Sequence, residues 1–292
     1  MEYITIFTPT YNREKLLPRL YNSLVEQENN NFIWLVVDDG SNDNTKELIT
    51  SFIKENKIKI EYIYQSNAGK NQAYNTGILN CRTRWFMCLD SDDYLTCNSI
   101  NLMLNQIHYI RGTKYIGVLS PKGCDSVTTL KQVVFPNLKF GTITDIYKAG
   151  FIGEINVLLK ADIAKLYLFP KIENEKFVTE AYILDQIDAK YEYYINSEII
   201  VIAEYQEDGL TNNILRLYKN NPKSYSAYFN QKMKLSNAIM DKIKAGAQYI
   251  CYSLFAGKKN FVSQSTSIPF VLMAFPLGIY LYLKRLYQYR HL

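Results

Sequence analysis

Short apolar runs alternate with helical patterns over the first third of the chain, and this alternation constrains the fold more than any other feature. The apolar runs predict strands at residues 3–8, 32–37, 60–64 and 85–89, with helices between them at residues 16–25, 44–55 and 70–80. Strands joined by helices pair in parallel through right-handed crossovers. The sequence therefore predicts an α/β fold, a mixed sheet flanked by helices.

The alternation fades after residue 115. Further strands are expected at residues 116–119, 133–135 and 157–159, and a helix at residues 181–190. The sequence thus predicts two halves of one domain and a helical extension, with boundaries at residues 1–115, 116–220 and 221–292.

Composition excludes several classes of protein. With 292 residues, 48% of them hydrophobic and 21% charged, the chain is long and apolar enough for a folded core. A net charge of +5 is too small to predict a nucleic-acid partner. Five cysteines without a C-x-x-C pair and only two histidines argue against zinc, a serine–histidine–aspartate triad and a multi-histidine metal centre. The odd number and the scatter of the cysteines favour a reducing compartment, and no secretory signal is expected at the start.

Two acidic clusters follow predicted strands, at residues 38–41 and 90–93. In parallel sheets, ligands bind outside the carboxyl ends of the strands. Asp90 and Asp92, two residues apart in an extended segment, suit a divalent cation held together with phosphate oxygens. Asp39 suits the imide N–H of a base. Two alternatives stay open, namely an acidic turn that caps the next helix and an ordinary Asp-Gly turn.

A third loop at the same edge covers residues 8–13, where Tyr11 is available to stack on a base. Neither a G-x-G-x-x-G motif after the first strand nor a phosphate-binding P-loop occurs. Ordinary dinucleotide binding and P-loop chemistry are therefore disfavoured.

Four blocks, at residues 8–13, 37–43, 67–77 and 89–93, resemble family 2 glycosyltransferases of the GT-A fold in order and spacing. The resemblance implies inverting sugar transfer from a UDP-sugar with Mn²⁺ or Mg²⁺ as cofactor. It also implies Asp90 and Asp92 as the metal aspartates, with Asp93 as a partial substitute. The residues that it places around the nucleotide sugar are Thr8, Tyr11, Arg13, Asp39, Asn67, Lys70, Asp90 and Ser91.

The same resemblance suggests a catalytic base in the segment at residues 177–182. Family members carry a Glu-Asp pair there, and this chain has Glu180 followed by Ala181, so Glu180 is the expected base and Asp185 a weaker substitute. A flexible loop near the diphosphate is expected to include Gly209, Thr211 and Asn212. A helix-starting glutamate and a plain polar loop are the alternative interpretations.

Residues 268–283 are almost wholly apolar and lie between Lys258-Lys259 and Lys284-Arg285. Basic residues and aromatic rings around an apolar helix favour an interfacial anchor on an anionic membrane surface. A helix packed on the catalytic domain is the alternative, and a full span is less favoured because the stretch falls short of roughly 20 residues.

The predicted activity is sugar transfer to a lipid-linked or membrane-held glycan in bacterial surface polysaccharide synthesis, at the cytoplasmic face of the membrane. Three alternatives remain: a teichoic-acid-type wall polymer transferase, a nucleotidyltransferase, and a catalytically dead module that binds a nucleotide or glycan. The alanine at position 181 keeps the last of these open.

Overall fold

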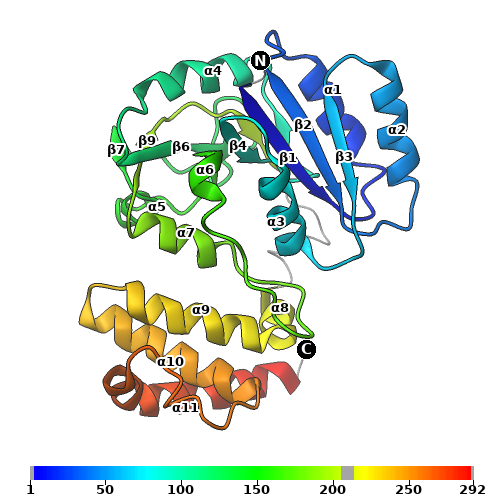
Figure 1. Cartoon of the computed structure of the whole chain (residues 1–292). Helices are drawn as coiled ribbons and strands as arrows, with labels where there is room; N and C mark the ends of the chain where they lie inside the picture. Colours follow the sequence, from blue (N-terminus) through cyan, green and yellow to red (C-terminus); the bar gives the residue numbers. More distant parts are fainter. Residues whose placement is uncertain (1–2, 205–213, 291–292) are drawn as a thin grey trace. The chain divides into compact units, whose positions relative to one another are not determined.

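The structure, a computed structural model, describes residues 3–204 and 214–290 (Figure 1). The chain divides into two compact units, one made of Met1–Leu168 with Lys190–Gln206 and the other of Phe169–Ala189 with Glu207–Leu292. This division differs from the expected boundaries at residues 115 and 220, since the second unit also takes up residues 169–189.

The first unit is built on a sheet. Its strands are β1 (Ile4–Thr10), β2 (Phe32–Asp38), β3 (Ile60–Tyr64), β4 (Trp85–Cys88), β5 (Tyr94–Leu95), β6 (Tyr115–Gly123), β7 (Phe140–Gly141), β8 (Ile155–Lys160), β9 (Glu192–Ile195) and β10 (Val201–Ile202). Its helices are α1 (Leu17–Val25), α2 (Thr45–Glu55), α3 (Lys70–Asn80), α4 (Ser99–Gln106), α5 (Ile143–Lys148) and α6 (Ala161–Ala164), with a 3-10 turn at Ile107–Tyr109.

The strand order along the sheet is β3-β2-β1-β4-β8-β6-β10-β5, and β9 joins β6 and β7 beside this path. β3, β2, β1 and β4 are parallel, whereas β8 runs antiparallel to both β4 and β6. The mixed sheet flanked by helices that the sequence predicts is therefore confirmed. The parallel half places the carboxyl ends of four strands along one edge.

Helices cover both faces of the parallel half (Figure 1). Alternate residues of β1 point to opposite faces, so Ile4 and Ile6 pack with Trp34 in the main core that α1, α2 and α4 close. Phe7 points the other way, toward α3, where a Cβ added at Gly77 would overlap the Phe7 ring. Glycine at this position thus allows α3 to pack directly on the sheet.

The second half of the sheet corrects one expected strand. Residues 133–135 form a loop in which the Thr129 hydroxyl donates to the Val133 carbonyl and accepts from the Val133 N–H. The Val134 side chain is 88% exposed. An apolar run here does not form a strand because no neighbouring strand covers it.

The second unit is helical, with α7 (Ala181–Asp188), α8 (Ile214–Asn220), α9 (Pro222–Leu235), α10 (Ile239–Phe255) and α11 (Ile268–Arg290). α7 belongs to this unit because it is bonded to α9: the Gln231 amide donates to the Tyr182 carbonyl, and the Asp185 carboxylate accepts from Lys232 and Tyr228. These contacts explain why the boundary does not fall at residue 220.

Candidate functional site

The ends of β1, β2, β3 and β4 lie along one edge of the sheet, and all of the predicted nucleotide-sugar residues belong to this first unit. The loop after β1 is bonded to the loop after β2: the Asn12 N–H donates to the Ser41 hydroxyl at 2.9 Å, and the Asn42 N–H donates to the Asn12 side-chain oxygen at 2.8 Å. Asn12 itself has a left-handed φ of 52°. The two loops therefore form one continuous surface.

Asp39 anchors the loop that leads from β3 into α3. One carboxylate oxygen accepts from the Gln65 amide at 2.7 Å and from the Ala68 N–H at 2.8 Å, and the other accepts from the Gly69 N–H at 2.7 Å. The side-chain amide of Asn67 donates to the Asp39 carbonyl at 2.8 Å. Asp39 is only 3% exposed. Its carboxylate holds the loop before α3 in place at the rim of the site, and this role is separate from any contact with a base.

Gly40 makes this arrangement possible. Its φ of +82° is left-handed, and a Cβ added there would lie 2.8 Å from the backbone nitrogen of Asn67. Any other residue would be strained and would push the loop after β3 away from the end of β2.

Lys70 is the first residue of α3, and its ammonium lies 2.8 Å from one carboxylate oxygen of Asp90 at the end of β4. Burial alone would raise the pKa of Asp90, but Lys70 and Lys122 outweigh it and lower that pKa to about 2. Asp90 therefore stays ionised throughout the physiological range.

Sequence reasoning missed Lys122, the only charged residue of β6. Its side chain is 13% exposed, and its ammonium lies 2.7 Å from the Asp93 carboxylate, 3.8 Å from that of Glu154 and 3.9 Å from that of Asp90. Burial raises the pKa of Asp93 to about 7, while the surrounding carboxylates hold the pKa of Lys122 above its ordinary value. The signal that could have indicated Lys122 is its position as the single charged residue of a largely buried strand.

Asp92 differs from its neighbours in that no side chain of the described residues donates to its carboxylate, and only its carbonyl accepts, from Arg19 at 2.6 Å. The side chain is half-buried, and Ser91 before it is buried. Within residues 3–204 and 214–290, no set of three or more His, Cys, Asp or Glu side chains is arranged for a metal ion. Asp90 and Asp92 remain the predicted ligands, because a hard cation prefers carboxylate oxygens.

The residues of the first loop have different environments. Tyr11 is 45% exposed and accessible for stacking. Arg13 uses its N–H to reach the Thr45 hydroxyl at 3.2 Å, which ties the loop to the start of α2. Thr8 lies deeper than the rest of this loop: its side chain is fully buried, and its hydroxyl accepts from the Trp34 indole at 3.0 Å. Thr8 shares the core face of β1 with Ile4 and Ile6, so it supports the site from beneath.

Glu180 and Asp185, the candidate bases, belong to the second unit. Glu180 is exposed immediately before α7, whereas the Asp185 carboxylate is held by Lys232 and the Tyr228 hydroxyl, both at 3.2 Å. Glu180 is therefore the more accessible carboxylate. Gly209, Thr211 and Asn212 lie outside the described residues.

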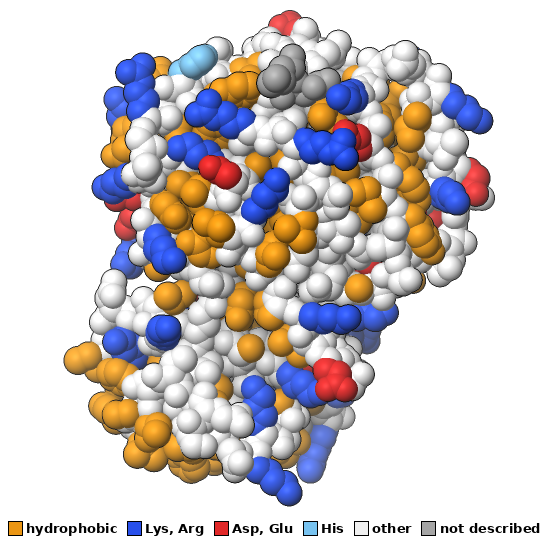
Figure 2. Space-filling model, in the orientation of Figure 1, with side chains coloured by type: hydrophobic (Ala, Val, Ile, Leu, Met, Phe, Trp, Pro, Cys, Tyr) orange, Lys and Arg blue, Asp and Glu red, His pale blue; other side chains and the backbone are white. Residues whose placement is uncertain are grey.

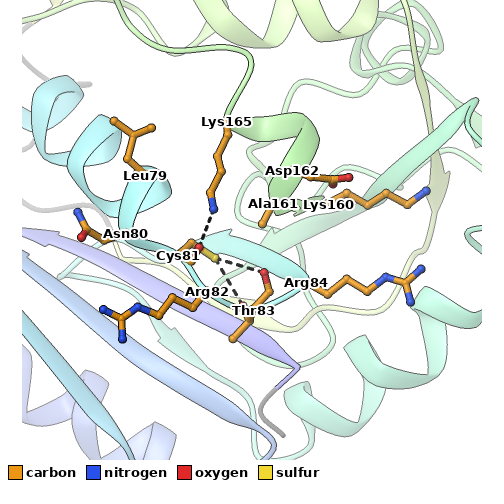
Figure 3. A pocket seen from close by; sticks show the side chains of 10 residues that line it. All are labelled: Leu79, Asn80, Cys81, Arg82, Thr83, Arg84, Lys160, Ala161, Asp162 and Lys165. Carbon is orange, nitrogen blue, oxygen red and sulfur yellow. Dashed lines mark hydrogen bonds between the residues drawn. The ribbon is translucent and has the colours of Figure 1, made fainter.

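A separate pocket of about 700 Å³ lies at the opposite edge of the sheet, where α3 ends and β4 begins (Figure 3). Its lysines are already engaged: Lys165 donates to the Cys81 carbonyl at 2.7 Å, and Lys160 donates to two backbone carbonyls. The guanidinium groups of Arg82 and Arg84 point away from each other. The two lysines thus bind backbone carbonyls, and the two arginines do not converge on a ligand.

Known proteins resemble the chain in both sequence and fold. Residues 5–144 match the family model described as Glycosyl transferase family 2. An uncharacterized glycosyltransferase of Haemophilus influenzae is 29% identical over 191 residues, which cover 63% of this chain and 72% of that protein. Glycosyltransferase GlyA of Streptococcus pneumoniae is 35% identical over 104 residues, which cover 36% of this chain but only 15% of GlyA.

Two solved structures share the fold at low sequence identity. S. aureus TarS 1-349, in complex with UDP-GlcNAc, has a TM-score of 0.65 at 16% identity and covers 99% of this chain and 92% of its own. The mannosyltransferase PcManGT from Pyrobaculum calidifontis, in complex with GDP-Man and Mn²⁺, has a TM-score of 0.58 at 14% identity and covers 97% and 81%. The mixed sheet is thus of the GT-A type, and residues 5–144 carry the match to glycosyl transferase family 2.

Proposed function

We propose that this protein is an inverting glycosyltransferase that moves a sugar from a UDP-sugar to a hydroxyl of a lipid-linked or membrane-held glycan in bacterial surface polysaccharide synthesis. The observation that carries the proposal is the Lys70–Asp90 ion pair beside the free carboxylate of Asp92, at the edge where the parallel strands end. A cation and two carboxylates at this edge suit a metal-bound diphosphate. The UDP-GlcNAc bound by TarS, which shares the fold, supports a uridine diphosphosugar as the donor.

The donor set fits Mn²⁺ or Mg²⁺, and Asp90 and Asp92 are the residues that would hold it. When bound, the ion supplies positive charge that stabilises the departing diphosphate. Asp39 keeps the loop before α3 in place, and Tyr11 offers its ring to the base. Arg13, Asn67 and Ser91 complete the proposed donor pocket. Lys70 would donate to a phosphate oxygen once Asp90 binds the ion.

Glu180 is the proposed base. Its carboxylate would take the proton from the acceptor hydroxyl as that oxygen attacks the anomeric carbon, on the face opposite the diphosphate. Attack from the opposite face inverts the configuration of the sugar. The exposure of Glu180 immediately before α7 supports this choice.

The experiment is a donor and acceptor panel with the full chain. The donors are UDP-glucose, UDP-galactose, UDP-GlcNAc, UDP-GalNAc and GDP-mannose, each tested with Mn²⁺. The acceptors are membrane-extracted lipid-linked glycans or a polyol-phosphate wall polymer. Nucleotide release is measured for each pair. We expect one UDP-sugar to give turnover that rises with the lipid-linked acceptor. Turnover that depends on the polyol-phosphate polymer would favour the wall-polymer activity, and tight UDP binding without turnover on any acceptor would favour a binding module.

A further inference from the structure

α11 packs on α10 through a narrow stripe of small side chains. Val271 and Ala274 are fully buried, and a Cβ added at Gly278 would lie 2.7 Å from the Ile250 Cβ. A Cβ added at Gly246 would likewise lie 3.2 Å from the Ala274 Cβ. The two helices therefore lie in close contact along one side of α11, and the contact fixes which side faces outward.

The outward side of α11 is apolar. It consists of large side chains that are between 40% and 59% exposed: Ile268, Leu272, Met273, Phe275, Leu277, Tyr280 and Leu283. Ile239 and Met240 at the start of α10 are also more than 60% exposed. Figure 2 shows hydrophobic side chains gathered at the lower edge of the helical unit. A helix whose outward side faced only water would carry polar residues there.

The same helices hold the positive charge of the chain. Residues 222–292 contain ten Lys or Arg against a single Asp and no Glu, whereas the preceding 221 residues contain 23 Lys or Arg against 27 Asp or Glu. Lys234, Lys244, Lys259 and Lys284 are exposed, and the Lys242 ammonium lies 5.2 Å from the centre of the Phe270 ring. Cations therefore surround an apolar face, which is the arrangement that binds anionic lipid headgroups.

We propose that α11 lies in the plane of an anionic membrane, with the Ile268–Leu283 face among the acyl chains and the lysines of α9, α10 and α11 among the headgroups. A second copy of the chain is a poorer occupant because two such faces would bring like charges together. By length and composition α11 also suits a span. A spanning α11 would, however, draw Lys242, Lys244 and Asp241 of the attached α10 into the hydrocarbon.

This inference deepens the proposed function, since a membrane-held acceptor requires the enzyme at the bilayer. Its test measures lipid binding and not sugar transfer. The membrane-binding proposal and the sugar-donor proposal can therefore be refuted independently.

The experiment is flotation of the full-length protein with vesicles of phosphatidylcholine alone or with 30 mol% phosphatidylglycerol. We expect wild type to bind the anionic vesicles at least about tenfold more than the neutral ones, and Leu272→Glu/Leu283→Glu to lose at least about tenfold of that binding. The matched control is Leu79→Glu/Leu166→Glu, two leucines of the first unit that are 56% and 69% exposed. This control should float like wild type.

Circular dichroism is used to check that each variant is folded. We expect all of them to fold because all four leucines are exposed. Equal binding to neutral and anionic vesicles, or full binding by Leu272→Glu/Leu283→Glu, would overturn the proposal. A wild-type dimer that ignores vesicles and becomes a monomer in Leu272→Glu/Leu283→Glu would identify a second copy as the occupant. Resistance to alkaline carbonate extraction would identify a span.

Discussion

Replacing Lys122 by methionine should destabilise the first unit by about 3 kcal/mol. The side chains of Lys122 and Asp93 are 13% and 5% exposed, and their charged atoms lie 2.7 Å apart. Removal of one partner of a buried pair costs about 3–5 kcal/mol because a buried charge loses its partner. The lower end is expected, since the pKa of Asp93 is already about 7 through burial, so that Asp93 takes up a proton when the cation is lost.

The assay is urea unfolding followed by tryptophan fluorescence. Both tryptophans, Trp34 and Trp85, are buried in the sheet, so the signal reports on the first unit. The matched control is Lys114→Met, because Lys114 forms an ion pair with Glu192 at the same distance of 2.7 Å but is 61% exposed. Exposed pairs contribute about 0–1 kcal/mol, so the control should unfold near the wild-type midpoint.

A double variant separates the charge from the packing. Asp93→Asn together with Lys122→Met removes both charges, and we expect it to recover about 2 kcal/mol relative to Lys122→Met alone. If Lys122→Met loses no more stability than Lys114→Met, Lys122 is not the buried counter-ion of the acidic cluster and the reasoning fails.

Three further predictions concern the donor site, the base and a helix cap. Gly40→Ala should weaken UDP binding by at least about tenfold in calorimetry because the added Cβ displaces the loop before α3. Gly112→Ala, also at positive φ but in open space, should bind UDP like wild type. Equal UDP affinities of Gly40→Ala and wild type would refute the contact. Glu180→Gln should retain UDP binding and lose transfer to the acceptor, and transfer at the wild-type rate would move the base elsewhere. Thr142→Ala removes the capping box of α5 and should cost about 1 kcal/mol at pH 7 in urea unfolding. The Thr142 N–H and hydroxyl both donate to the Asp145 carboxylate and lower its pKa, and alanine keeps only the N–H. The hydroxyl's share of the cost is therefore present above the unfolded pKa of about 4 and is lost as the pH falls through the folded value. A cost that does not change across this titration would contradict the assignment.

The parallel half of the sheet follows from local sequence. The predicted strand at residues 32–37 becomes Phe32–Asp38, and the strand at residues 60–64 is found as predicted. Continuous apolar runs between helical patterns mark strands that are covered on both faces. The acidic loops could likewise be placed at the strand ends because chain order fixes the edge of a parallel sheet at which they meet.

The rest depends on contacts that are distant in sequence. β7 and β10 are only two residues long. β7 is defined by its pairing with β9, and β10 by its pairing with β6 and β5, so no local sequence pattern predicts them. Thr8 opens the block at residues 8–13 that suggested a binding loop, and it is buried because alternation along β1 turns it toward Trp34. Lys122 joins Asp93 from a strand 29 residues away in the chain, which no spacing rule anticipates.

The most direct test of the nucleotide-sugar site is the initial rate of UDP release from the preferred UDP-sugar in Mn²⁺. The proteins to compare are wild type, Asp92→Asn and Asp162→Asn, the last being an exposed aspartate at the opposite edge of the sheet. We expect the rate of Asp92→Asn to fall by at least about a hundredfold and Asp162→Asn to match wild type, with wild type itself silenced by EDTA. Equal rates for wild type and Asp92→Asn would contradict the assignment of Asp90 and Asp92 as the metal and diphosphate site.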